Sequence, residues 1–255
     1  MVSHAHVHSE AMPALQEVFR HRCRLPPATA GNALVAMADL SEWMPWRAEA
    51  ETLLSAAERE RVARKRRPQD REQLILAYAL HRLFLAAIWR IAPQEVPLGR
   101  DAEGRPRLGD RGGRTSLSHA AGAAAFAFCS EGVVGIDVES RERIGAMAEI
   151  AGQVAHPDEL ARLAMPPARD EHLLALWVRK EAFLKAVGVG LVCEMNGFHA
   201  AEGAVLETRL AESEYRDCEG TEALRVQTLP LHAGFLLAVA APPALRVEAI
   251  RLSPH

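Results

Sequence analysis

The spacing of apolar and polar positions changes several times along the chain, and each spacing predicts a different kind of element. Between residues 55 and 90, apolar side chains recur at the period of an α-helix. Ser55, with Glu58 three residues later, is a capping-box pattern at the beginning of this stretch, and Pro68 interrupts it. We therefore expect a short helix, a break, and a longer helix that restarts at Asp70.

The pattern changes after residues 99–113, a loop rich in glycine, proline and charge. Three short strands joined by glycine-containing turns are predicted at residues 115–118, 123–129 and 133–139. Residues 173–186 then carry the strongest helical pattern of the chain, which Gly188 and Gly190 end. The remainder, residues 197–252, alternates short apolar runs with turns, as the strands of a closing sheet do.

Helices and strands thus alternate in two similar blocks, and the fold class that we predict is α+β. We place an N-terminal αβ half at residues 30–125 and a C-terminal αβ half at residues 126–255. Internal duplication would produce this arrangement, although no clean sequence repeat is visible. Residues 1–29 are an N-terminal extension with three alternating histidines. Such histidines could bind a metal, but a mobile tail is the commoner explanation; they are His4, His6 and His8.

The location of charge is more informative than its total. The 255 residues carry a formal charge of −3 and only 5% aromatic residues, which argues against a nucleic-acid-binding protein with a stacking surface. Between Arg59 and Arg71, however, seven Arg or Lys residues stand against two acids. A solvated surface is the ordinary explanation of such a block, and a phosphate-binding surface is the alternative.

The cysteines bear on the compartment. Four of them lie far apart in the sequence without a C-x-x-C pair. No stretch approaches the ~20 apolar residues of a membrane span, and no charged-then-apolar leader is visible. We therefore expect a reduced, soluble, cytoplasmic protein without a membrane partner.

The most informative motif is Gly135-Ile136-Asp137-Val138-Glu139. Residues two apart on a strand point to the same face, so Asp137 and Glu139 are expected side by side. Two neighbouring carboxylates repel unless a cation or a proton lies between them, and their hard oxygens suit magnesium. A solvated acidic edge strand explains the same residues equally well.

A second motif lies on the predicted helix at residues 173–186. Trp177, Glu181 and Lys185 are spaced four apart and share one helix face. A surface Glu–Lys pair beside a buried tryptophan is the ordinary explanation. A carboxylate and an amine on one face can also complete a metal site and bind a phosphate.

Two shorter motifs can present phosphate contacts. Ser118 and His119 end the first predicted strand, and no nucleophile-elbow sequence surrounds the serine, so a hydrolase nucleophile is not indicated. Arg105 and Pro106 follow a glycine in a loop that the proline stiffens. A histidine bonded to a backbone carbonyl and a solvated arginine are the alternatives.

Together these motifs resemble, in their order, those of the 4′-phosphopantetheinyl transferases: a basic helix, G-[KR]-P, S-H, G-I-D-V-E and W-x-x-K-E-A-x-x-K. The chain is similar, over residues 55–191, to the longer pseudo-dimeric type that activates surfactin synthetase and related peptide and polyketide synthases. The resemblance implies two similar halves with coenzyme A in the cleft between them. It also implies transfer of 4′-phosphopantetheine from coenzyme A to a serine of an acyl or peptidyl carrier protein, with magnesium assistance and release of 3′,5′-ADP.

The resemblance assigns roles to individual residues. It makes Asp137, Glu139 and Glu181 the magnesium ligands. It implies a set of residues that bind coenzyme A, with Arg105 on the 3′-phosphate side: Arg61, Arg105, Pro106, Ser118, His119 and Lys185. Glu181 and Lys185 are the expected catalytic residues, and either Glu181 or a metal-bound water is the general base. Asp70 and Arg82 are expected as structural supports.

Two positions depart from the family pattern. Glu58 stands where a second basic residue is expected, and Gln73 replaces an arginine. Arg66 or Arg71 could substitute for the missing phosphate contacts.

The expected partners are coenzyme A and the carrier protein, with no nucleic acid and no membrane. A pseudo-dimer that builds its own cleft has no need to oligomerise, so we expect a monomer. The carrier protein is expected to dock on residues that follow the metal strand: Arg141, Arg143, Ile144 and Met147. Two alternatives remain open, namely another magnesium-dependent nucleotide transferase or hydrolase and a non-catalytic coenzyme A-binding protein. The first would not need all these motifs together, and the second would lose a metal ligand.

Overall fold

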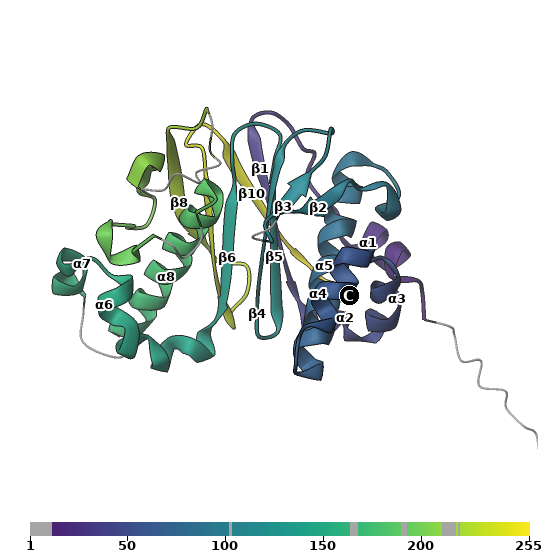
Figure 1. Cartoon of the computed structure of the whole chain (residues 1–255), viewed down its shortest axis with the longest axis horizontal. Coiled ribbons are helices and arrows are strands. Elements are labelled where there is room, and N and C mark those ends of the chain that lie inside the picture. Colours follow the sequence, from purple (N-terminus) through teal and green to yellow (C-terminus); the bar gives the residue numbers. More distant parts are fainter. Residues whose placement is uncertain (1–11, 102–103, 164–167, 190–192, 211–217, 219) are drawn as a thin grey trace, which may run out of the picture.

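The computed structural model describes residues 12–101, 104–163, 168–189, 193–210, 218 and 220–255. This part of the chain is a mixed α+β structure in which two sheets lie between two groups of helices (Figure 1). Within the same ranges, no helix is long and apolar enough to cross a membrane. Four residues named above lie outside the described ranges: His4, His6, His8 and Gly190.

The first sheet has the strand order β10-β1-β5-β4. β1 (Asn32–Asp39) pairs in parallel with β10 (Arg246–Leu252) and antiparallel with β5 (Ala123–Cys129). β4 (Arg114–Ala120) pairs with the other side of β5. The boundary that we expected after residue 125 falls inside β5, and the C-terminal strand pairs with β1 instead of lying in the second sheet.

The second sheet has the order β6-β9-β8-β7 and is antiparallel throughout. Its strands are β6 (Gly135–Ser140), β9 (Phe235–Ala241), β8 (Ala223–Leu229) and β7 (Val205–Glu207). A two-stranded sheet of β2 (Leu98–Arg100) and β3 (Pro106–Leu108) lies against β4. The three strands predicted between residues 115 and 139 are confirmed as β4, β5 and β6.

A core of small and branched side chains joins the two large sheets. Because side chains alternate along a strand, β5 directs Ala125 and Ala127 to this inter-sheet core and Phe126 to the helices on its other face. β6 contributes Ile136 and Val138 to the inter-sheet core. Asp137, which lies between them in the sequence, points away from this core.

The outer face of the first sheet is covered by α5 (Pro68–Trp89), which Figure 1 shows beside α4 (Ala56–Ala63). The predicted capping box at Ser55 is present. α5 begins at Pro68 and not at Asp70. Proline suits the first turn of a helix, because the backbone N–H that it lacks would have no partner within the helix there and its φ is already helical. The predicted apolar face of this helix is buried: Leu74, Tyr78, His81 and Leu85.

The outer face of the second sheet is covered by α8 (Ala168–Val187), which confirms the helix predicted over residues 173–186. Gly135 at the beginning of β6 permits a close approach of this helix. A Cβ atom there would collide with the carbonyl oxygen of Ala182 and the backbone nitrogen of Ala186. The glycine therefore brings α8 against β6, beside the acidic residues of that strand.

Short elements complete the description. The remaining α-helices are α1 (Leu15–Arg22), α2 (Leu40–Trp43), α3 (Arg47–Thr52), α6 (Ala151–Val154) and α7 (Pro157–Arg162). The 3-10 helices are Met44–Trp46, Pro93–Glu95, Arg141–Ile150, Met195–Gly197 and Thr208–Leu210.

Candidate functional site

Three motifs that are distant in the sequence meet where β4, β6 and α8 come together. Lys185 Nζ lies 2.6 Å from Asp137 Oδ1 and 2.9 Å from Ser118 Oγ. The Ser118 hydroxyl also donates to Asp137 Oδ1 at 2.8 Å. The structure thus joins Ser118, Asp137 and Lys185 in one polar group.

Asp137 has one carboxylate oxygen without such contacts. The residue is 4% exposed, and Oδ2 is buried without a hydrogen-bond partner among the described residues. A buried carboxylate oxygen without a partner is costly, because it has lost its water and gained nothing in return. A cation or a proton donor at Oδ2 would remove this cost.

Glu139 and Glu181 complete the acidic group. Burial raises the pKa of Glu139, and the neighbouring charge of Asp137 raises it further, although an ion pair with Arg143 opposes both effects. Burial likewise raises the pKa of Glu181 to about 7, followed by the charge of Asp137. The charge of Asp137 thus contributes to the raised pKa of both glutamates, which lie close enough to it for their charges to interact.

The donor set fits a hard divalent cation, since three carboxylates that repel one another and an unpartnered buried oxygen would all be relieved by it. The three carboxylates do not converge on one point, however. Among the described residues, their ligand atoms do not form a group within 4.8 Å of one another. The ion pairs of Asp137 with Lys185 and of Glu139 with Arg143 partly neutralise the acidic group instead.

His119 faces the other side of β4 from Ser118, because successive side chains of a strand alternate. It lines a cavity of about 430 Å³ together with residues of α4, α5 and β2. The residue is exposed to solvent, although many protein atoms surround its ring. Burial, then the charges of Lys65, Lys185 and Arg100, lower the pKa of His119 to about 4, so the ring is neutral at pH 7.

The wall of this cavity is basic. Its cationic side chains are Arg61, Arg64, Lys65 and Arg100, and none of the described residues that line it is acidic. Gly104 explains how Arg61 reaches the loop between β2 and β3: a Cβ atom at Gly104, where φ is +89°, would collide with the Arg61 guanidinium. The sequence prediction of Arg61 as a phosphate contact is therefore compatible with its position in the cavity wall.

Arg100 was not identified from the sequence. Its guanidinium lies 4.3 Å from the ring centre of Tyr78, and one nitrogen donates to the carbonyl oxygen of Gly104 at 3.2 Å. Its Nε and Nη2 are buried without hydrogen-bond partners among the described residues. A buried guanidinium with unused donors is suited to an anion. No sequence pattern distinguishes Arg100 from the other arginines of this loop.

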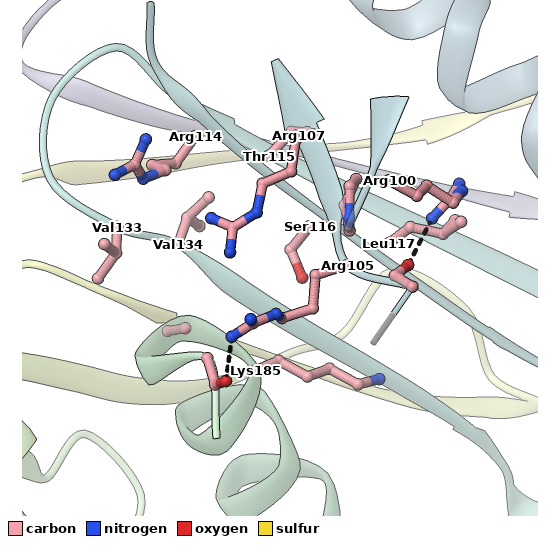
Figure 2. A pocket seen from close by; sticks show the side chains of 14 residues that line it. Arg100, Arg105, Arg107, Arg114, Thr115, Ser116, Leu117, Val133, Val134 and Lys185 are labelled. Carbon is pink, nitrogen blue, oxygen red and sulfur yellow. Dashed lines mark hydrogen bonds between the residues drawn. The ribbon is translucent and has the colours of Figure 1, made fainter. Parts of the chain in front are cut away.

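Arg105 and Pro106 line a second cavity of about 220 Å³, which shares Arg100, Gly104 and Leu117 with the first. Figure 2 shows Arg105 directed toward the C-terminal end of α8, where it donates to the carbonyl oxygen of Gly188. Its Nε also donates to Asp101 Oδ2 at 2.7 Å. Further cationic side chains in this wall are Arg107, Arg114 and Lys185.

One of the two departures from the family pattern, Glu58, has a structural explanation. Glu58 is buried and pairs with Arg82, whose Nη2 lies 2.9 Å from Glu58 Oε2. Arg82 is thus a structural support, as predicted. Arg71 donates to the carbonyl oxygens of Lys65 and Arg66 and does not line either cavity. Lys65, in the basic block for which a solvated surface was the ordinary explanation, is exposed and also lines the larger cavity.

Lys180, also part of the helix motif, points away from the acidic group. Its Nζ is fully buried and donates to Glu159 and to the carbonyl oxygens of Val154 and Met195. Arg143 lies over the ring of Trp177 at 5.1 Å, so the tryptophan packs beside the Glu139–Arg143 pair. Lys180 and Trp177 therefore support the site without lining the two cavities.

Comparisons with known proteins point to the family that the sequence motifs resemble. Residues 133–240, which contain β6 and α8, match the model of the 4′-phosphopantetheinyl transferase superfamily. A Synechocystis protein that is provisionally named 4′-phosphopantetheinyl transferase slr0495 is 28% identical over 189 residues, 72% of this chain and 74% of its own length.

Two further relatives are similar over shorter shares. The 4′-phosphopantetheinyl transferase HetI of Nostoc is 28% identical over 144 residues, 54% of this chain and 61% of its own length. A phosphopantetheinyl transferase of Thraustochytrium is 28% identical over 182 residues, 65% of this chain and 63% of its own length. The family model and the relatives together support a 4′-phosphopantetheinyl transferase.

Proposed function

We propose that this chain transfers the 4′-phosphopantetheine group of coenzyme A to a serine hydroxyl of an acyl or peptidyl carrier protein. The observation that carries the proposal is the contact of Lys185 with Asp137 and Ser118, beside two basic cavities that share Arg100. It combines a cation-binding carboxylate, a phosphate-binding amine and room for a polyphosphate substrate. The finer assignment, to the pseudo-dimeric type that activates surfactin synthetase, is part of the proposal.

The reaction exchanges a phosphoanhydride bond of coenzyme A for a phosphate ester bond to the carrier serine. The serine oxygen of the carrier protein forms a bond to the β-phosphorus of coenzyme A, and the bond from that phosphorus to the bridging oxygen breaks. The electron pair leaves with 3′,5′-ADP. The serine proton goes to Glu181, which is the carboxylate that we assign as general base.

Asp137, Glu139 and Glu181 would hold a magnesium ion, and the unpartnered Asp137 Oδ2 is the oxygen that most needs one. When bound, magnesium neutralises charge on the pyrophosphate and on the leaving group. The chain's own contribution is positional. Lys185 holds a phosphate oxygen through a charged hydrogen bond, and the Ser118 hydroxyl orients both Lys185 and Asp137.

The basic cavities would bind the nucleotide part of coenzyme A. We assign phosphate contacts to Arg61, Lys65 and His119 in the larger cavity and to Arg105 in the smaller one. Arg100, with its unused donors, stands between them. Because the chain as a whole is mildly acidic, this concentration of positive charge favours an anionic ligand at this place and not over the whole surface.

The carrier protein would dock on the 3-10 helix that follows β6. Arg141 and Arg143 are partly exposed there, and arginines suit the acidic helices of carrier proteins. Met147, which we had included in this surface, is fully buried in the core below α8 and cannot touch a partner. We propose that the protein acts as a monomer, since a single chain supplies all the residues of the site. We also propose that it acts in the cytoplasm.

The test is to incubate an unmodified carrier protein with this chain, coenzyme A and magnesium, and to measure the carrier's mass. We expect the gain of one phosphopantetheine group and no reaction with a chelator present. Asp137→Ala should abolish turnover while coenzyme A still binds through the basic cavities, and Glu207→Ala, at an exposed ion pair, should react normally. Carrier proteins of fatty-acid, peptide and polyketide type that all stay unmodified would contradict the proposal.

A further inference from the structure

A second group of metal-ligating side chains lies outside the proposed active site, beside α7. One ligand atom each from His156, Asp158 and His199 lies within 4.8 Å of the other two, and no other group of three among the described residues does so. Asp158 Oδ2 is 3.7 Å from His156 Nδ1 and 3.9 Å from His199 Nε2. The centres of the two imidazole rings are 4.1 Å apart, and the ring planes are tilted by 39° to each other.

The backbone that carries the first histidine is held in place by a buried carboxylate. Glu159 Oε2 accepts hydrogen bonds from the backbone nitrogen of His156 and from Lys180 Nζ, and Oε1 accepts from the backbone nitrogen of Ala200. Glu159 therefore ties the beginning of α7 to the segment that contains His199. Lys180 is fully buried, so this connection lies in the protein interior and not in a mobile surface pair.

The second histidine stands between two anchored neighbours. Phe198 is buried against Phe183, with ring centres 5.4 Å apart. On the other side, the carbonyl oxygen of Ala200 accepts a hydrogen bond from Arg179 Nε at 2.7 Å. His199 itself is exposed, so its backbone is fixed while its ring is accessible from solvent.

We propose that His156, Asp158 and His199 bind a divalent transition-metal ion of the zinc type, with water as a further ligand. Two imidazoles and one carboxylate are the donors that zinc prefers when it has three protein ligands. Ligands at the usual zinc distances stand about 3.3 Å apart in a tetrahedron. The two distances to Asp158 exceed this value by about 0.4 and 0.6 Å, and the two histidine atoms lie within 4.8 Å of each other, so side-chain rotation has to bring the three atoms closer together.

Binding has a local cost and a local consequence. His156 Nδ1 now accepts a hydrogen bond from the backbone nitrogen of Asp158 at 3.2 Å, and the metal takes over that lone pair. In exchange, the ion joins α7 to the segment 198–200, both of which pack on α8 through the Glu159–Lys180 pair. The bound ion is a stabilising cross-link that is separate from the magnesium site, and it does not depend on the proposed function.

The test uses the full-length chain with His4, His6 and His8 replaced by alanine, so that the N-terminal histidines bind no metal. Zinc bound after equilibrium dialysis is counted by elemental analysis, and the melting temperature is measured with and without zinc. We expect His199→Ala to lower the number of tightly bound zinc ions by one and to remove at least part of the zinc-induced rise in melting temperature. Without zinc, its melting temperature should match that of the parent.

His232→Ala is the matched control. His232 Nε2 lies 3.7 Å from Asp39 Oδ2, so it is a similar His–Asp pair but is not part of any three-ligand group among the described residues. The control should bind as much zinc as the parent. The proposal is wrong if His199→Ala keeps the zinc stoichiometry and the zinc-induced stabilisation of the parent, or if the parent binds zinc no more than His199→Ala does.

Discussion

Lys185 of α8 and Asp137 of β6 form an ion pair at 2.6 Å that spans 48 residues of sequence. The amine lies at the edge of a basic cavity, whereas the carboxylate is buried. The pair supplies a positive charge to Asp137 Oδ1 and leaves Oδ2 without a hydrogen-bond partner among the described residues. The same ion pair therefore contributes to stability and to the proposed catalysis.

Lys185→Met tests both roles, since methionine keeps much of the packing and removes the charge. We expect kcat/KM to fall about ten- to a hundredfold, because charged hydrogen bonds are worth about 1.5–3 kcal/mol. The melting temperature should also fall by several degrees, since Asp137 stays buried with less compensation. Excess magnesium should recover part of the lost stability but not the lost activity.

If the Lys185→Met protein were active and had a normal melting temperature, the pair would be an ordinary ionic contact with no role in the reaction. Arg209→Ala is the control, because it removes an exposed ion pair with Glu207 and should change neither quantity.

Arg105→Ala tests recognition of the 3′-phosphate. We expect the unmodified chain to prefer coenzyme A to its 3′-dephospho form and the variant to lose most of that preference. Arg107→Ala is the matched control, since Arg107 lines the same cavity and also pairs with Asp101, at 2.9 Å. The measurement is kcat/KM for both substrates. Equal losses for the two substrates would place Arg105 away from the 3′-phosphate.

The pKa of His119 gives a test that needs no turnover. Burial and nearby cations lower it to about 4, below the 6.5 of a free histidine, so the folded protein is stabilised by this group above pH 6.5 and loses that contribution as the pH falls toward 4. Lys65→Met should raise the pKa by removing a positive neighbour, and bound coenzyme A should raise it by adding negative charge. NMR titration of the ring measures each change, and a pKa that coenzyme A leaves unmoved would separate His119 from the phosphates.

Lys180→Met tests whether the lysine inside the helix motif is structural. Loss of one partner from a buried ion pair costs about 3–5 kcal/mol, because Glu159 would remain buried without its counter-charge. We expect a large fall in the denaturant midpoint and near-normal kcat for the fraction that remains folded. A stable protein with lost activity would instead assign Lys180 to the reaction.

Local residue patterns were sufficient to predict the main helices and strands and the acidic and basic residue types of the candidate site. The period-2 pattern around Asp137 identified β6 and the face of its carboxylates, and the four-residue spacing on the helix put Glu181 and Lys185 together. The capping box at Ser55 likewise depends only on neighbouring residues. Local patterns are reliable here because each residue involved is a few positions from its partner.

Contacts between distant segments were decided by the tertiary structure alone. The pairing of β10 with β1 joins the two ends of the chain, and no local pattern encodes it. The same holds for the basic cavities: Lys65 and Arg100 look like ordinary surface residues in the sequence, and only the packing of α4, α5 and the β2–β3 sheet brings them to one wall. Charge identifies a residue as a possible ligand, but burial and the neighbours that the fold supplies decide whether its donors are left free for one.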